Sequence, residues 1–232
     1  MKELPEAETY EEGLEYWPYK TSLLTVIEYI CEHAPQNGKL LDVMCGPGYL
    51  FGKIKEKRPD LSLYGVDIDE RYIEHGNKTY SGVHFEQGDV LTWRPEEKFD
   101  VVVCTGSVHH IPYELQEQAI ANIASMASPA GLVIISDCYV DDYSDETERK
   151  QAAAKLGYEY IRETIANGGS ERVISWTIDI LSNDVLMHEF KPSYEKRLPL
   201  LEKCFGKVTT IKTWPNANPP GYGDYIHICE VR

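Results

Sequence analysis

Basic side chains are scarce in this sequence of 232 residues. It holds 23 Lys and Arg against 38 Asp and Glu, which gives a formal net charge of −15 at pH 7. Nucleic acids and anionic membranes attract basic surfaces, so a chain this acidic is repelled by both. The composition therefore argues against nucleic acid and membrane surfaces as partners.

Long apolar runs are also missing. No window approaches the roughly 18 apolar residues that a membrane-spanning helix needs, and the opening MKELPEAETYEEG lacks the apolar centre of a secretory signal. The six cysteines are scattered, without a Cys-x-x-Cys pair, and several lie in apolar runs where Cys acts as a small hydrophobic side chain. We expect a cytoplasmic protein with reduced cysteines, no disulfide framework and no zinc site.

The sequence does contain an alternation of short apolar runs and helical patterns. Strands are predicted at 39–44, 61–66, 83–85, 99–104 and 132–135, with helices at 50–57, 70–77 and 114–126. Strands that alternate with helices of this length are typical of a parallel sheet covered on both faces. The predicted fold class is therefore α/β, a Rossmann-like three-layer sandwich.

The two ends of the chain and one insertion depart from this alternation. An acidic, Tyr-rich arm precedes one amphipathic helix at the N-terminus, and further helices are predicted at 146–167, 170–181 and 193–204. Strands at 208–214 and 225–231 close the chain as a hairpin, so the last strand is expected to run antiparallel. We predict a single domain, built from a helical arm (1–38), a core (39–140), a helical insertion or lid (141–206) and the last two strands (207–232).

A glycine-rich turn, CGPG, follows the first predicted strand. Glycines at such a turn let the backbone approach a ligand closely. The dinucleotide motif G-x-G-x-x-G needs a third glycine, but Phe51 stands at that position after Gly46 and Gly48. The bulk of Phe51 argues against a pyrophosphate-binding site. Asp42 on the strand, followed by this turn, instead suits a ligand with an amino-acid tail.

Two further carboxylates follow the next two predicted strands. Asp67 ends the second strand, where it can accept from both hydroxyls of a ribose, and Asp89 follows the third, where it can accept from an adenine amine. The carboxyl ends of parallel strands form the edge at which open α/β sheets bind ligands. An Asp after a strand is also a common helix N-cap, and Asp69 is predicted to cap the helix that begins at Glu70.

Four segments together resemble the class I S-adenosylmethionine-dependent methyltransferase family: LLDVMCGPGYL, YGVDID, GDV and FDVVVCTGSVHHI. The resemblance covers roughly residues 39–137, in family order and spacing. It implies a seven-stranded, mostly parallel sheet with an antiparallel last strand. It also implies a cofactor-binding core that uses S-adenosylmethionine and yields S-adenosylhomocysteine. Met44 is one departure, because the family usually has Gly there.

The same resemblance implies a set of cofactor contacts. Asp42 and the backbone of Gly46 would face the methionine moiety, while Asp67 would hold the ribose and Asp89 with Val90 the adenine. The strand tip at Cys104 and Thr105 would lie near the sulfonium. In full, the expected cofactor-binding residues are Tyr19, Asp42, Cys45, Gly46, Gly48, Asp67, Ile68, Asp89, Val90, Cys104 and Thr105.

Two histidines follow the fourth predicted strand, at the mouth of the expected cofactor site. Methyl transfer to a protonated acceptor needs a general base, and histidine titrates in the useful range. We expect His109 or His110 to deprotonate or hold the acceptor, the alternative being that one of them only packs against the next helix. Some quinone-precursor O-methyltransferases of the family bind a metal here through Glu-x-x-Glu-His. The matching positions are Gly106, His109 and His110, so both carboxylates are missing and no metal is expected.

Acceptor recognition is expected in the arm and the insertion, because members of the family differ mainly there. The expected contacts are Tyr16, Tyr143 and Trp176, although aromatic side chains at helical spacing also fill cores. A lid formed by both segments would exclude water from the site. Residues 1–36 and 139–206 hold 21 acidic and 11 basic residues. That surplus either marks solvated helix faces or forms an acidic rim that favours a neutral or cationic acceptor.

The predicted function is S-adenosylmethionine-dependent methyl transfer to an O or N atom of a small metabolite, by a monomer or homodimer. The alternatives are methylation of a protein or RNA, and a catalytically inactive S-adenosylmethionine-binding scaffold. The scarcity of basic residues argues against RNA. The three carboxylates and the histidine pair favour an active enzyme.

Overall fold

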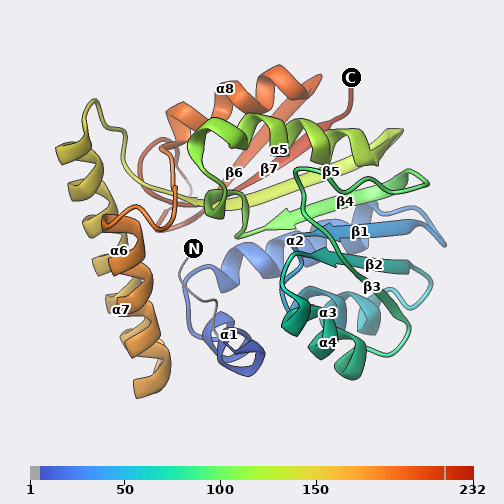
Figure 1. Ribbon diagram of the computed structural model, residues 1–232, viewed down its shortest axis with the longest axis horizontal. Coiled ribbons are helices and arrows are strands. Elements are labelled where there is room, and N and C mark those ends of the chain that lie inside the picture. Colours follow the sequence, from blue (N-terminus) through green and yellow to red (C-terminus); the bar gives the residue numbers. More distant parts are fainter. Residues whose placement is uncertain (1–5, 217) are drawn as a thin grey trace.

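Seven strands form one sheet in the order β3-β2-β1-β4-β5-β7-β6 (Figure 1). The computed structural model describes residues 6–216 and 218–232, so the first five residues of the predicted arm and Ala217 of the last loop lie outside the described residues. The strands are β1 (Lys39–Val43), β2 (Ser62–Asp67), β3 (Val83–Gln87), β4 (Phe99–Thr105), β5 (Ala127–Tyr139), β6 (Lys207–Trp214) and β7 (Gly223–Glu230). Neighbours pair in parallel except that β7 runs antiparallel to β5 and β6. The predicted mixed sheet is confirmed.

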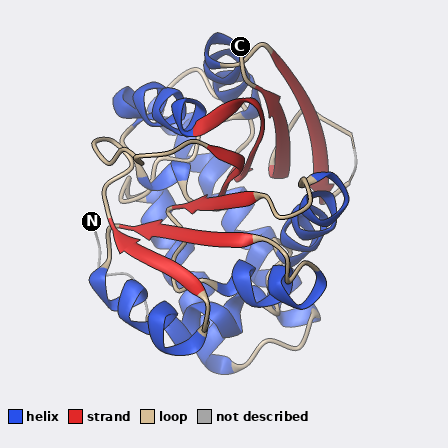
Figure 2. Ribbon diagram, turned by 90° about the vertical axis from the view of Figure 1, so that its right-hand side faces the viewer, coloured by secondary structure: helices blue, strands red, loops and turns tan. Residues whose placement is uncertain are grey.

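Helices cover both faces of the sheet (Figures 1 and 2). They are α1 (Ala7–Leu14), α2 (Lys20–His33), α3 (Tyr49–Lys57), α4 (Glu70–Thr79), α5 (Tyr113–Met126), α6 (Glu146–Ala166), α7 (Glu171–Val185) and α8 (Tyr194–Cys204), with a 3₁₀ turn η1 (Val108–His110). Asp69 caps α4 as predicted, since its side chain accepts from the backbone N–H of Arg71. The short helix α1 within the arm was not predicted individually.

The hydrophobic core has two parts, one on each face of the sheet, because alternate side chains of each strand point to opposite faces. In β4, Val101 and Val103 pack into the cluster that also contains residues of α2 and α3, whereas Val102 and Cys104 pack into the cluster under α5. All four side chains are at most 1% exposed. Burial on both faces explains why these strands read as continuous apolar runs rather than as an alternating pattern. The three-layer α/β architecture is confirmed.

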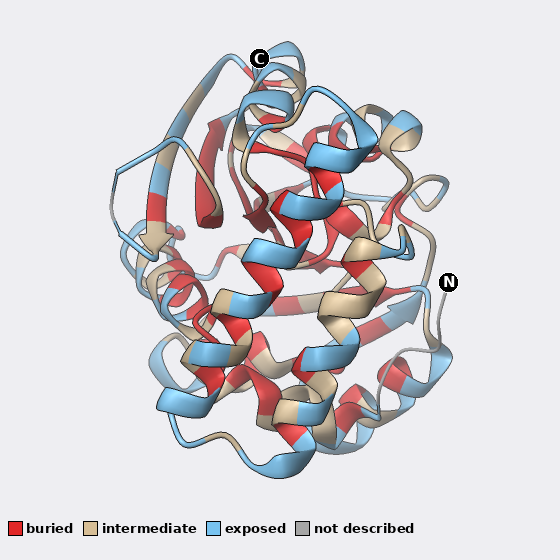
Figure 3. Ribbon diagram, turned by 90° about the vertical axis from the view of Figure 1, so that its left-hand side faces the viewer, coloured by how far each residue is buried: buried red, intermediate tan, exposed pale blue. Residues whose placement is uncertain are grey.

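The long helices α6 and α7 lie beyond the sheet, at the end towards which β4 points (Figure 1). They form an antiparallel pair whose exposed residues face outward and whose buried residues face the rest of the molecule (Figure 3). The arm reaches the same end, where α1 packs against α7. Both non-core segments therefore meet at the sheet edge where the sequence places its acidic residues. Across the described residues, none of the helices has the length and apolar character that a membrane span requires.

Candidate functional site

The turn between β1 and α3 has a left-handed backbone. The φ angles are 60° at Met44, 55° at Gly46 and 100° at Gly48. A Cβ at Gly48 would also lie 2.8 Å from the Phe85 ring, so this position requires glycine on two counts. Met44 occupies a conformation that L side chains adopt only rarely. This explains why the related family usually has Gly at that position.

The carboxylates at the ends of β2 and β3 are held by backbone N–H groups. Asp67 accepts from Gly46 (2.8 Å) and from Asp69 (2.9 Å), and Asp89 accepts from Leu91 (2.8 Å). Burial raises the pKa of Asp67, and the two backbone donors offset part of that rise. Each carboxylate oxygen has a second lone pair, so both side chains can still accept from a ligand.

Asp42 lies on β1, an interior strand of the sheet. Its side chain is buried, and no described residue bonds to its Oδ1 atom. Burial, together with the nearby Asp67, raises the pKa of Asp42 well above its usual range. A buried acceptor without a partner is costly, so this oxygen is suited to a donor that a ligand would supply.

One cavity gathers part of the predicted cofactor set. Gly46, Asp67, Ile68, Asp89 and Val90 line it, and its described lining includes neither Lys nor Arg. The remaining predicted residues lie elsewhere. Asp42, Cys45, Gly48, Cys104 and Thr105 are outside the lining, and Tyr19 lines the neighbouring cavity. Tyr10, Tyr72 and Leu91 line the first cavity and were missed from the sequence.

A second cavity adjoins the first under the lid. Its walls are aromatic and aliphatic and include Trp17, Tyr19, Tyr160 and the predicted Trp176, while its floor carries His109, Glu189 and Lys191. Tyr16 and Tyr143 are not among the residues that line either cavity. Three residues line both cavities: Tyr10, Gly106 and His110. The two spaces therefore meet at the carboxyl end of β4.

Contacts between the arm and α7 close this second cavity. The Trp17 indole N–H donates to Thr177 Oγ1 over 2.9 Å, in a buried bond. The Trp17 and Trp176 rings are 4.9 Å apart, and the Tyr10 ring lies 5.9 Å from Trp176. Because aromatic pairs at these separations attract one another, the two segments form a common lid.

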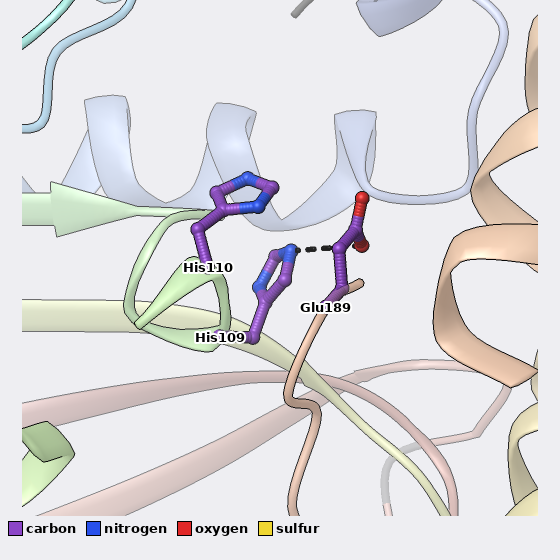
Figure 4. Close-up of side chains that lie close together, drawn as sticks. All are labelled: His109, His110 and Glu189. Carbon is purple, nitrogen blue, oxygen red and sulfur yellow. Dashed lines mark ion pairs between the residues drawn. The ribbon is translucent and has the colours of Figure 1, made fainter. Parts of the chain in front are cut away.

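His109 belongs to a buried chain of polar groups. Its Nδ1 atom bonds to Asp137 Oδ1, and Arg197 Nη2 lies 3.3 Å from Asp137 Oδ2. Burial alone would raise the pKa of Asp137, but His109 and Arg197 outweigh burial and lower it. Asp137 is therefore ionised at neutral pH, so Nδ1 must carry the proton that is donated. The Nε2 atom lies 3.6 Å from Glu189 Oε2 (Figure 4).

His110 stands next to His109 on η1, with ring centroids 4.2 Å apart. Burial and the neighbouring His109 lower the pKa of His110 to about 4. The imidazole is therefore neutral at pH 7 and can act as a base or a ligand. The loop after α7 is tied to this turn, because the backbone N–H of Phe190 donates to the carbonyl of His109 over 2.7 Å.

The floor of the second cavity contains charged residues that the sequence did not single out. Lys191 lies 2.7 Å from Asp184 Oδ1 and also pairs with Glu189. Burial raises the pKa of Asp184 to about 6 despite Lys191. The sequence predicts that acidic residues of the insertion form either solvated helix faces or an acidic rim. Glu189 and Lys191 flank Phe190, but nothing in the local pattern distinguishes Asp184 and Glu189 from the exposed acidic residues.

Comparisons with known proteins find similarity to methyltransferases. Residues 40–131 match the family described as "Methyltransferase domain". A trans-aconitate 2-methyltransferase of Sinorhizobium fredii is 37% identical over 60 residues, which is 26% of this chain and 23% of that protein. The alignments with such curated relatives span less than half of those proteins' length.

Solved structures share the fold over nearly the whole chain. An S-adenosylmethionine-dependent methyltransferase from Clostridium acetobutylicum superposes with a TM-score of 0.61 at 12% identity, covering 92% of both chains. The N-methyltransferase NodS from Bradyrhizobium japonicum, crystallised with S-adenosylhomocysteine, gives a TM-score of 0.60 at 12% identity, covering 94% of this chain and 90% of NodS. At this identity the likeness concerns the fold.

Proposed function

We propose that this chain, which belongs to the class I S-adenosylmethionine-dependent methyltransferases, moves the methyl group of S-adenosylmethionine to an O or N atom of a small metabolite. The junction of the two cavities at Tyr10, Gly106 and His110 carries the proposal. A cofactor in the first cavity and an acceptor in the second would meet there. In-line displacement at an activated carbon depends mainly on such positioning.

The charge of the first cavity supports this cofactor. Asp67 and Asp89 line it, Asp42 lies behind it with an unpartnered oxygen, and its described lining carries no basic side chain. S-adenosylmethionine has a sulfonium and an ammonium group, whereas a dinucleotide would bring two phosphates next to these carboxylates. When bound, the cofactor supplies an electrophilic methyl group. Asp67 would hold the ribose and Asp89 the adenine end.

The second cavity supports a small acceptor. Trp17 and Trp176 cover a cavity lined largely by aromatic and aliphatic side chains, which suits a small acceptor better than a protein or RNA. His109 would accept the proton of an acceptor hydroxyl or ammonium at Nε2, because Asp137 holds its other nitrogen as a donor. Asp137 and Arg197 would then orient the imidazole and stabilise its charged form.

Binding tests the proposal first. Titration calorimetry of the purified protein should detect S-adenosylhomocysteine, and Asp67→Ala should weaken it about 10–100-fold, as expected for a lost charged hydrogen bond of roughly 1.5–3 kcal/mol. Glu74→Ala, at an exposed position of α4, is the control and should bind normally. Absence of S-adenosylhomocysteine binding to the unaltered protein would refute the proposal. A homocysteine-release screen over small hydroxyl and amine compounds then identifies the acceptor.

A further inference from the structure

His109, His110 and Glu189 bring three ligand atoms within 4.8 Å of one another (Figure 4). The two histidines lie on η1 after β4, and Glu189 lies on the loop after α7, so the group forms only where core and lid meet. All three residues line the second cavity. We propose that they bind a divalent transition-metal ion such as Zn²⁺ or Fe²⁺. Two imidazole nitrogens and a carboxylate oxygen are a donor set that such ions prefer over Mg²⁺.

The surroundings of His109 match those of a metal ligand. Its Nδ1 atom bonds to Asp137 Oδ1, and Arg197 Nη2 lies 3.3 Å from the other oxygen of that carboxylate. A carboxylate on the second nitrogen fixes the tautomer and the ring orientation, which presents the Nε2 lone pair to the ion. Nε2 is also the atom that faces Glu189, at 3.6 Å. Asp137 thus holds the His109 ring at Nδ1, and Nε2 is the atom that faces the proposed ion.

The charge balance of this region also favours a cation. The ion pairs around the group contain three carboxylates, from Asp137, Asp184 and Glu189, and two basic groups, from Lys191 and Arg197. Carboxylates therefore outnumber basic groups around the proposed ligands, which attracts a cation.

The position of the group distinguishes it from a purely structural site. Three protein ligands leave at least one coordination position open, which is typical of catalytic metal sites. Because the group lines the acceptor cavity, that open position faces the space in which a hydroxyl-bearing acceptor would bind. A metal there would lower the pKa of such a hydroxyl, and His109 would then act as a ligand instead of a base.

Metal binding can be measured without cofactor or acceptor. Chelator-stripped protein is titrated with Co²⁺, which should produce visible d–d absorption that Zn²⁺ abolishes by displacement. Removal of a ligand in His110→Ala or Glu189→Gln should weaken Zn²⁺ binding by at least about 100-fold. Asp137→Asn, which alters the hydrogen bond that orients His109 and also the contact with Arg197, should cost about 10–100-fold. His33→Ala, which removes an exposed histidine of α2, is the matched control and should bind Zn²⁺ normally.

Absence of Co²⁺ absorption would overturn the proposal, and so would a Zn²⁺ affinity that His110→Ala and Glu189→Gln leave unchanged. Circular dichroism of each variant verifies folding. Glu189→Gln conserves size, so it remains informative even where an alanine variant fails to fold. S-adenosylhomocysteine calorimetry on the same metal-free protein is independent of the metal titration. A failure of the metal site is therefore distinguishable from a failure of the proposed methyl transfer.

Discussion

Asp137 and Asp224 show how neighbours decide the charge of a buried side chain. Both carboxylates have no exposed surface. The pKa of Asp137 falls because His109 and Arg197 outweigh burial. Burial raises the pKa of Asp224 to about 7, and no described residue bonds to its Oδ2 atom. One side chain is therefore an anion that bonds to His109, and the other retains its proton near neutral pH.

Asp224 should make stability depend on pH. In the unfolded chain an Asp loses its proton near pH 4, whereas folded Asp224 keeps it until about pH 7. The contribution of Asp224 is therefore fully present below about pH 4 and is lost as the pH rises to about 7, by up to about 4 kcal/mol. Urea unfolding of the unaltered protein and of Asp224→Asn, between pH 4 and 8, measures this difference. Parallel pH profiles for the two proteins would contradict it.

His109 should contribute to turnover rather than to cofactor binding. His109→Gln removes the group that accepts the acceptor's proton, so kcat should fall at least about 100-fold for a hydroxyl acceptor. The affinity for S-adenosylhomocysteine should be unchanged, because His109 lines only the second cavity. Steady-state kinetics and calorimetry separate these effects. Unchanged kcat combined with a lower melting temperature would instead assign His109 a packing role.

At the level of elements, the lid depends on close packing between α6 and α7. Gly157 of α6 faces Leu181 of α7, and a Cβ at Gly157 would lie 2.4 Å from Leu181 Cδ1 and 2.8 Å from its Cβ. The missing side chain lets the two helices approach closely beside the acceptor cavity, which Gly157 also lines. The shape of that cavity therefore depends on the apolar contact between Gly157 and Leu181.

Gly157→Ala should destabilise the protein by about 1–3 kcal/mol through overpacking, more than the gain in helix propensity offsets. Leu181→Ala removes the Cγ and Cδ1 contacts and keeps the one at Cβ, so the double variant should lose less stability than the sum of the two single variants. Urea unfolding of all four proteins completes the cycle. Additive losses would show that the helices separate without strain at this contact.

At the level of the whole molecule, the net charge of −15 concerns the choice of acceptor. The second cavity, which we propose binds the acceptor, is lined by Asp184 and Glu189, with Lys191 as the basic residue of its described lining. Acidic residues also surround the lid, although some are paired, as Asp142 is with Lys196. This distribution favours a neutral or cationic acceptor over an anionic one.

Several of the curated relatives are named for trans-aconitate, a tricarboxylate, and this chain should methylate it poorly. A cationic amine of similar size should have a higher kcat/KM at low salt. That advantage should shrink towards about 0.5 M NaCl, where the Debye length falls to a few Å. Homocysteine release with both compounds across salt concentrations provides the measurement. Rapid, salt-independent turnover of trans-aconitate would exclude an electrostatic preference.

The sequence by itself determined the fold and the ligand edge. Apolar runs such as 99–104, the glycine turn before α3 and Asp67 after β2 are local signals. Each depends on backbone conformation and burial within a few residues, so the sheet and its antiparallel last strand could be predicted, and the cofactor edge stays a prediction.

Only the tertiary structure decided what surrounds His109. Asp137, Glu189 and Arg197 come from β5, the lid and α8, and Tyr10 reaches the cofactor cavity from the arm. Periodicity indicates which side of an element is buried, but not which distant element covers it. The contacts that define the acceptor cavity depend on long-range packing, and no local pattern in the sequence records that packing.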